Sequence, residues 1–117
     1  MEIEIKTPNT LEECFTDLDN VFQDLPKSKE VFKNITNEYG AAIMEHNFLG
    51  RMIRNLYNPW YESPLKTILT ESGITHPDDM SHHILVAYHR YLNGKEINLI
   101  KQKEEEDFYL SNKYSIS

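Results

Sequence analysis

The chain has 117 residues, of which 39% are hydrophobic and 26% charged, a composition that fits one globular domain and excludes a disordered chain. Its formal net charge is −7, and residues 1–30 contain eight acidic side chains against three lysines. This acidity disfavours binding to nucleic acid or to an anionic membrane and favours a basic protein partner. We therefore expect a single domain over 1–117, with a core over about 8–100 and an acidic, aromatic tail over 101–117.

No feature of the sequence directs the chain out of the cytoplasm. Glu2 and Glu4 stand near the start, where a secretory signal has basic residues followed by an apolar block. No apolar run approaches the roughly 18 residues of a membrane span. The single cysteine, Cys14, cannot form an internal disulfide, which agrees with a reducing compartment. We therefore expect a cytoplasmic protein in which Cys14 is a small buried hydrophobe.

The N-terminal part is expected to contain one strongly amphipathic helix. Residues 1–5 alternate apolar and polar side chains, which indicates a short strand or an extended arm. Thr10 and Glu13 form a capping box, and apolar residues then recur at helical spacing from Leu11 until Pro26 ends the pattern. The outer face of this helix carries four carboxylates, which we assign as partner-binding residues: Glu12, Glu13, Asp17 and Asp19.

Two further helices are predicted in the next third of the chain. A short helix spans 27–37, Gly40 interrupts the pattern, and a longer helix spans 41–57. Gly50 lies within the longer helix, where a glycine costs about 1 kcal/mol relative to alanine, so we expect another backbone to approach closely there. This helix is expected to face inward through Ile43, Met44, Phe48, Met52, Ile53 and Leu56.

Clear capping signals mark the ends of a fourth and a fifth helix. Ser63-Pro64 begins the fourth helix, and Gly73 fits its left-handed closing position. Residues 75–79 begin the fifth helix with a proline and two acids in the first turn, and Asn93-Gly94 ends it. Residues 95–102 are predicted as one short strand, followed by a tail that is either loose or docked through its aromatic side chains. The predicted fold is mainly α, a compact bundle of about five helices with short extended terminal segments.

The stretch from Phe48 to Leu99 resembles a family of small uncharacterised bacterial domains. The resemblance rests on these motifs: Arg54-Asn55, Trp60, His76-Pro77-Asp78-Asp79-Met80-Ser81 and Tyr88-His89-Arg90-Tyr91-Leu92-Asn93-Gly94-Lys95. It covers somewhat under half of the chain and leaves out the first forty residues and the tail. A leucine usually precedes the tryptophan in that family, whereas Pro59 stands there in this sequence. The resemblance implies a shared fold and no catalytic residues.

Several polar residues of this stretch are candidates for a ligand pocket. The segment 76–81 most simply caps a helix, with its carboxylates accepting hydrogen bonds from free backbone N–H groups. Arg54 and Arg90 could grip a carboxylate or phosphate if they meet in space. The alternative is that Arg54 pairs with Asp78 or Asp79 and ties two helices together. The full candidate pocket comprises Arg54, Asn55, Trp60, His76, Asp78, Asp79, His89 and Arg90.

No catalytic or metal site is predicted. His82 and His89 share a face of the fifth helix, but they lie about 10.5 Å apart along its axis, too far to chelate one ion. No histidine pair has the i,i+4 spacing of a helical zinc site, and phosphate-binding loops and nucleophile motifs are absent. We therefore expect no catalytic residue, metal or cofactor, and an enzyme is less expected than a binding protein.

Three functions stay open at this point. The first is a non-enzymatic protein-interaction domain, of the immunity or inhibitor type, that presents its acidic face to a basic partner. The alternative is a small-molecule or metal-binding domain built on the candidate pocket. The third is a structural module that associates with copies of itself. None of the three involves nucleic acid or a membrane.

Overall fold

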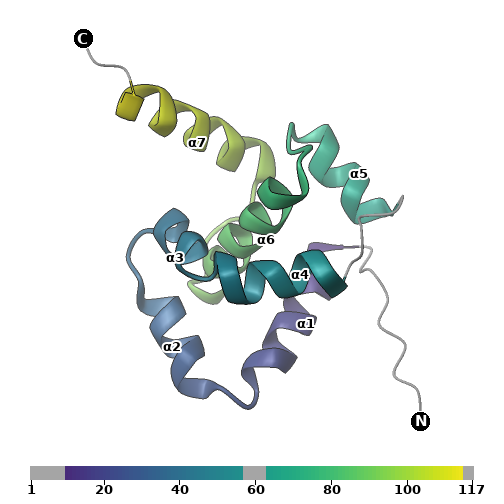
Figure 1. Ribbon diagram of the computed structural model, residues 1–117, viewed down its shortest axis with the longest axis vertical. Coiled ribbons are helices and arrows are strands. Elements are labelled where there is room, and N and C mark those ends of the chain that lie inside the picture. The colour runs from purple at the N-terminus through teal and green to yellow at the C-terminus, as the bar shows by residue number, and fades with distance from the viewer. Residues whose placement is uncertain (1–9, 57–62, 115–117) are drawn as a thin grey trace.

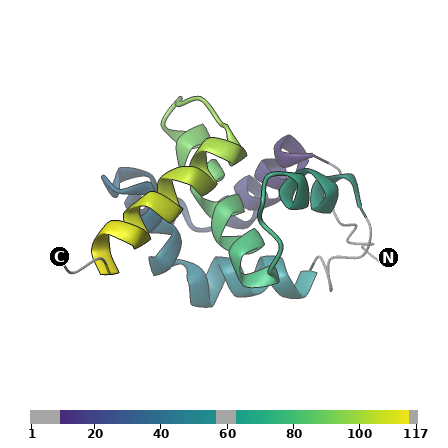
Figure 2. The same ribbon diagram turned by 90° about the horizontal axis from the view of Figure 1, so that it is seen from above.

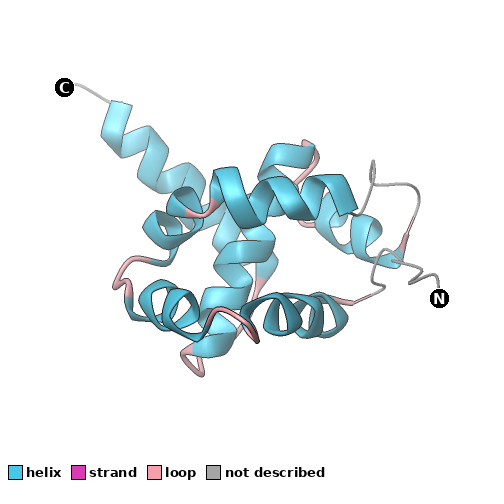
Figure 3. Ribbon diagram, turned by 60° about the horizontal axis from the view of Figure 1, so that its bottom comes forward, coloured by secondary structure: helices cyan, strands magenta, loops and turns pink. Residues whose placement is uncertain are grey.

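The computed structural model describes residues 10–56 and 63–114, and within these ranges helices are joined by short loops, without a strand (Figure 3). The predicted mainly α fold is therefore confirmed, although the number of helices exceeds five. The elements of the described ranges are α1 (Leu11–Phe22), α2 (Pro26–Asn34), α3 (Glu38–Met44), the π-helical turn η1 (His46–Gly50), α4 (Arg51–Leu56), α5 (Pro64–Glu71), α6 (Pro77–Leu92) and α7 (Leu99–Tyr114). No helix of this part of the chain is both long and apolar enough to cross a membrane. The strand or arm expected over 1–5 lies outside the described residues.

Helix α6 is the centre of the fold. The elements α1, α2, α3, η1, α4 and α7 all pack against it, and Figures 1 and 2 show them arranged around it. Every residue from Ile84 to His89 is buried, so this helix is enclosed on nearly all sides rather than along one stripe. Three polar residues of this helix are also buried: Ser81, His83 and His89.

Aromatic rings fill the space between α6 and the first two helices. The ring of Tyr88 lies 5.7 Å from that of Phe15, 6.2 Å from that of Phe22 and 5.9 Å from that of Phe32, measured between centroids. Such ring pairs add to the hydrophobic stabilisation that follows from their burial. Cys14 is fully buried beside them, as predicted.

The helix ends agree with the capping signals in the sequence. The hydroxyl of Thr10 accepts a hydrogen bond from the N–H of Glu13, and the hydroxyl of Ser63 accepts one from the N–H of Lys66. Gly73 has a φ of 89° and closes α5, with the N–H of Ile74 donating to the carbonyl of Leu69 at 2.9 Å. This is the hydrogen bond of a Schellman motif.

The long third helix predicted over 41–57 is wrong in two respects. The segment begins at Glu38, so Gly40 lies inside α3, and a π-helical turn separates α3 from α4. Gly50 donates to the carbonyl of Glu45 at 2.9 Å, the i→i−5 bond of that turn. The predicted inner face is also wrong at three positions, because Ile43, Met44 and Phe48 are 67%, 54% and 56% exposed.

A different stripe of the same segment faces the core. Ala41, Ala42, Leu49 and Ile53 are buried, and Met52 is partly buried. The alanines belong to α3, which packs on α6, and small side chains let two helices approach closely. Ile43 and Met44 are instead turned outward, and the side chain of Leu56 lies outside the described residues.

The predicted strand over 95–102 and the extended C-terminal segment are also wrong. Asn98 caps a helix by accepting a hydrogen bond from the N–H of Lys101 at 3.0 Å, and α7 follows from Leu99. The tail is docked, but through polar side chains near its start rather than through Phe108, which is 71% exposed. In Figures 1 and 3 the C-terminal half of α7 extends away from the other helices.

Candidate functional site

Three of the four acidic residues of α1 lie outside the buried side of the helix. Glu12 and Glu13 are exposed and Asp17 is half-buried, whereas Cys14, Phe15 and other apolar residues of the helix are enclosed. No lysine or arginine occurs within α1. The helix therefore presents carboxylates to solvent from a backbone that its apolar side holds in place.

Asp19 differs from the other three carboxylates of α1. Its Oδ1 atom accepts a 2.6 Å hydrogen bond from the hydroxyl of Tyr88 and lies 3.2 Å from the ammonium group of Lys29. Asp19 therefore joins α1 to α6 and α2, and a partner would have to compete with both contacts. Asp19 is therefore held by side chains of two other helices.

The candidate pocket residues fall into two groups, and the first lies at the N-terminus of α6. The Nδ1 atom of His76 accepts a hydrogen bond from the N–H of Asp78 at 3.1 Å and so caps the helix. Arg54 donates to the hydroxyl of Ser81 at 2.8 Å, and its Nε atom lies 3.5 Å from the carboxylate of Asp78. The expected tie between Arg54 and Asp78 is confirmed, and Asp79 lies half-buried in the same turn.

The second group lies at the C-terminus of α6. Arg90 contacts the carboxylate of Glu38 at 2.7 Å, and its Nε atom donates to the carbonyl of Glu96 at 2.7 Å. The Nε2 atom of His89 lies 2.8 Å from the carbonyl oxygen of Ile35. Both side chains therefore fasten neighbouring segments to α6.

The two groups do not meet. Asp78 and Arg90 are twelve residues apart on one helix, which corresponds to about 18 Å along its axis. Arg54 and Arg90 each have separate partners at opposite ends of α6, so they do not form one anion-binding pair. The side chains of Asn55 and Trp60 lie outside the described residues.

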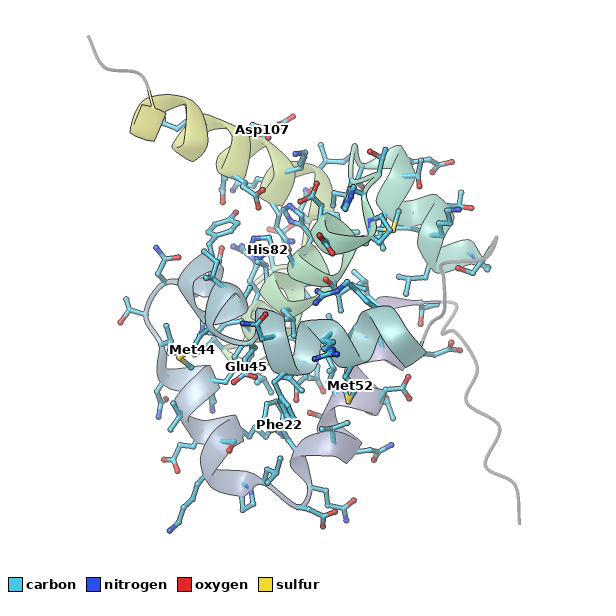
Figure 4. All side chains as sticks on the ribbon, viewed as in Figure 1. Phe22, Met44, Glu45, Met52, His82 and Asp107 are labelled. Atoms are coloured by element: carbon cyan, nitrogen blue, oxygen red, sulfur yellow. The ribbon has the colours of Figure 1, made fainter. Side chains whose placement is uncertain are left out.

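A polar cluster between α6 and α7 was not anticipated from the sequence. The carboxylate of Glu106 lies 3.0 Å from Nε2 of His82 and 3.1 Å from Nε2 of His83. The side-chain amide of Gln102 donates to the carbonyl of His83 at 3.3 Å and lies 3.5 Å from its Nδ1 atom. This arrangement fits the tautomer of His83 in which Nδ1 accepts and Nε2 carries the hydrogen, beside the carboxylate of Glu106. Figure 4 shows His82 on the side of α6 that faces α7.

The charges of this cluster shift two pKa values. Burial acts to raise the pKa of Glu106, but the hydrogen bonds and charges of His82 and His83 outweigh it and hold that pKa far below its ordinary range. Burial, the charge of Glu105 and other nearby carboxylates raise the pKa of Tyr39, whose hydroxyl donates to the carbonyl of Gln102 at 3.1 Å. Glu106 is therefore a partly buried carboxylate that contacts α6 from α7.

The cluster could have been found from the sequence only in part. Leu99, Gln102 and Glu106 have the i, i+3, i+7 spacing of one helix face, and Asn98 precedes them as an N-cap residue. A polar inner face does not follow from hydrophobic periodicity, however, because that analysis counts apolar residues alone. Within the described ranges, no three His, Cys, Asp or Glu side chains are placed to hold a metal ion.

The family model described as "Domain of unknown function (DUF6794)" matches residues 7–92. The chain belongs to this family. The DUF6794 match includes α1 to α6 and ends before α7, so it takes in the first helices, which the resemblance over Phe48–Leu99 left out, and it does not include residues 93–99. No curated protein and no solved structure matches the chain. Membership of DUF6794 therefore identifies the domain without assigning a function.

Relative to the DUF6794 match, the polar cluster joins two parts of the chain. Tyr39, His82 and His83 lie within the matched residues, whereas Gln102 and Glu106 lie after them on α7. Helix α7 therefore lies outside the matched residues and docks on them through hydrogen bonds and charge as well as through Leu99.

Proposed function

We propose that this DUF6794 chain is a non-enzymatic protein-interaction domain that binds a basic partner through the outer face of α1, as a small immunity or inhibitor protein does. The observation that carries the proposal is the composition of α1, which has carboxylates on its solvent side and no cationic residue. Glu12 and Glu13 lie in the first turn, where acidic side chains stabilise a helix through its dipole, whereas Asp17 lies beyond that turn.

The face is held at a defined geometry. Thr10 caps α1, and Cys14, Phe15 and Leu18 anchor its opposite side in the core. Glu12 and Asp17 are five residues apart, which places them about 7.5 Å apart along the helix axis. Because the backbone is fixed, a partner with suitably spaced lysine or arginine side chains binds without first ordering this helix.

The chemistry of the face predicts how binding depends on conditions. Attraction between the carboxylates and a basic partner accelerates association and selects that partner. Dissolved salt weakens this attraction, and at 0.1 M ionic strength charges more than roughly 10 Å apart are largely screened from each other. We therefore expect an affinity that falls as salt is added, mainly through a slower association rate.

The test is charge reversal with a matched control. Wild-type protein captures its partner from a lysate of the native host, and the partner is identified by mass spectrometry and purified. The variant Glu12→Lys/Asp17→Lys is compared with Glu71→Lys/Glu96→Lys, which makes the same charge change at exposed sites outside α1. Titration calorimetry is carried out for each variant at low and at moderate salt.

The expected result is a loss of at least tenfold in affinity for the α1 variant and little change for the control. Circular dichroism shows whether each variant keeps its helices. Equal binding by both variants, or a captured partner that is acidic, would show that the α1 face is not the binding surface.

A further inference from the structure

Helix α7 docks on the rest of the chain with little apolar burial. The structure describes its side chains over residues 99–108, and of the three apolar ones only Leu99 is buried, whereas Ile100 and Phe108 are 56% and 71% exposed. The other side chains that contact α6 are Gln102 and Glu106, which are polar. Apolar burial is the main source of stability in a folded chain, and hydrogen bonds add less because they replace bonds to water.

The polar contacts of α7 are also less favourable than those between α1 and α6. Gln102 is almost fully buried, yet its Nε2 atom lies 3.3 Å from the carbonyl oxygen of His83, at the long end of the hydrogen-bond range. Its Oε1 atom is buried without a hydrogen-bond partner among the described residues. By comparison, the bond between Tyr88 and Asp19 measures 2.6 Å. A buried polar atom without a partner has lost its bonds to water, so the Oε1 atom of Gln102 opposes docking.

The connection before α7 allows the helix to move without unravelling the helices before it. The Nε atom of Arg90 donates to the carbonyl of Glu96 at 2.7 Å, which fastens the loop to α6 as far as Glu96. The N-cap of α7 is Asn98, whose side chain accepts from the N–H of Lys101, so the cap travels with the helix. The C-terminal half of α7 already extends away from the other helices (Figures 1 and 3). A pivot at Ile97 therefore separates two parts that each keep their own helix ends.

We infer that α7 is a lid that opens from the DUF6794 domain as one unit, while α1 to α6 stay folded, and that its opening uncovers His82, His83 and Tyr39. In the closed form His83 is fully buried, and the hydroxyl of Tyr39 donates to the carbonyl of Gln102. Opening turns this side of the domain into a surface with two imidazole rings and a phenol hydroxyl in water. No residue of α1 takes part, so the inference is independent of the proposed function.

The first test is hydrogen exchange of the full chain over a series of low urea concentrations. A detached helix of 16 residues is only marginally stable in water, so its amides exchange whenever the lid opens. We expect the amides of residues 103–108 to exchange at least tenfold faster than those of Ile84–His89. Their exchange should also depend less on urea, because opening the lid exposes less surface than global unfolding.

Two variants distinguish a lid from a helix that is lost only when the whole chain unfolds. Tyr88→Phe weakens the α1–α6 contact in the closed and open forms alike, so it should accelerate exchange in α6 at least fivefold and leave α7 unchanged. Glu106→Gln weakens the closed form alone, so it should accelerate exchange in both helices at least fivefold. The control is Glu104→Gln, which makes the same charge change on the exposed side of α7 and should alter neither.

Chemical labelling gives a second readout that follows side chains instead of amides. Diethyl pyrocarbonate modifies accessible histidines, and a thiol reagent modifies Cys14, which is buried in the core; mass spectrometry of peptides gives both rates. Tyr88→Phe should accelerate labelling of Cys14 and leave that of His83 unchanged. Glu106→Gln should accelerate labelling of His83 at least fivefold.

Three results would overturn the inference. Amides of α7 that exchange together with those of α6, with both accelerated by Tyr88→Phe, would show that the chain opens only as a whole. Labelling of His83 that rises with that of Cys14 in Tyr88→Phe would show that α7 does not uncover His83 on its own. An α7 without any protection in wild-type protein would show that the lid does not close.

Discussion

The hydroxyl of Tyr88 donates a 2.6 Å hydrogen bond to Asp19, and this bond joins the centre of α6 to α1. Tyr88 is fully buried, and a tyrosine hydroxyl removed from water needs such a partner. Burial, with the hydrogen bond to Asp19 and its charge, raises the pKa of Tyr88 well above its ordinary value. The hydroxyl therefore stays protonated and remains a donor across the physiological pH range.

Replacing Tyr88 by phenylalanine is expected to lower the free energy of unfolding by about 1–2 kcal/mol, because a hydrogen bond to a charged acceptor is lost. The measurement is urea denaturation followed by circular dichroism. Tyr91→Phe is the control, since the Tyr91 side chain is 47% exposed, and a change within about 0.5 kcal/mol is expected there. If Asp19→Asn costs as much in the Tyr88→Phe background as in wild-type protein, the two residues are not coupled.

The contact of Glu106 with His82 and His83 predicts how the stability of α7 docking depends on pH. The pKa of Glu106 is lowered in the folded state, so its contribution is present above the unfolded-state pKa of about 4.3 and is lost as the pH falls. Glu106→Gln is expected to lower the free energy of unfolding near neutral pH by about 1–3 kcal/mol. The difference from wild-type protein should shrink as the pH falls below about 4.

This pH dependence can be measured by urea denaturation over a pH series and by hydrogen exchange of the α7 amides. The control is Glu96→Gln, because Glu96 is exposed in the loop before α7, so that loss of its charge is expected to change the free energy of unfolding little. A stability difference that stays constant with pH, or that grows in acid, would contradict the assigned role of Glu106.

The local signals in the sequence predicted the start of α1 and both ends of α5 and α6 because capping depends on neighbouring residues alone. Thr10, Ser63 and His76 each cap the helix that follows, and Gly73 and Gly94 have positive φ angles of 89° and 69°. These positions require a particular side chain or the absence of one, whatever packs nearby. Local chemistry was therefore sufficient there.

Two glycine substitutions test this conclusion in opposite directions. Gly73→Ala is expected to destabilise the protein by about 1–2 kcal/mol, because a Cβ atom is strained at a φ of 89° even though its nearest neighbour, the Cγ atom of Lys103, would be 3.8 Å away. Gly40→Ala is expected to stabilise it by about 0.5–1 kcal/mol, because Gly40 lies inside α3 and an added Cβ meets only Asn37 at 3.7 Å. Thermal unfolding of both variants gives the comparison, and equal effects of the same sign would contradict it.

The features that the sequence did not predict depend on contacts between distant residues. Two apolar stripes of the segment from α3 to α4 have helical spacing, and periodicity does not say which of them α6 covers. The candidate pocket required Arg54 and Arg90 to converge, but the length of α6 separates them. The docking of α7 depends on Gln102 and Glu106, which meet residues of α6 about twenty positions earlier in the chain.

Substitutions at adjacent positions of α3 distinguish the two stripes. Ala42→Leu is expected to cost about 1–3 kcal/mol, because Ala42 is fully buried where α3 packs on α6 and a larger side chain has no room. Ile43→Ala is expected to change the free energy of unfolding by less than about 0.5 kcal/mol, because Ile43 is 67% exposed. Urea denaturation of both variants measures each effect on the fold. A cost of several kcal/mol for Ile43→Ala would place that side chain in the core and would contradict the assignment of Ile43 to the exposed stripe of α3.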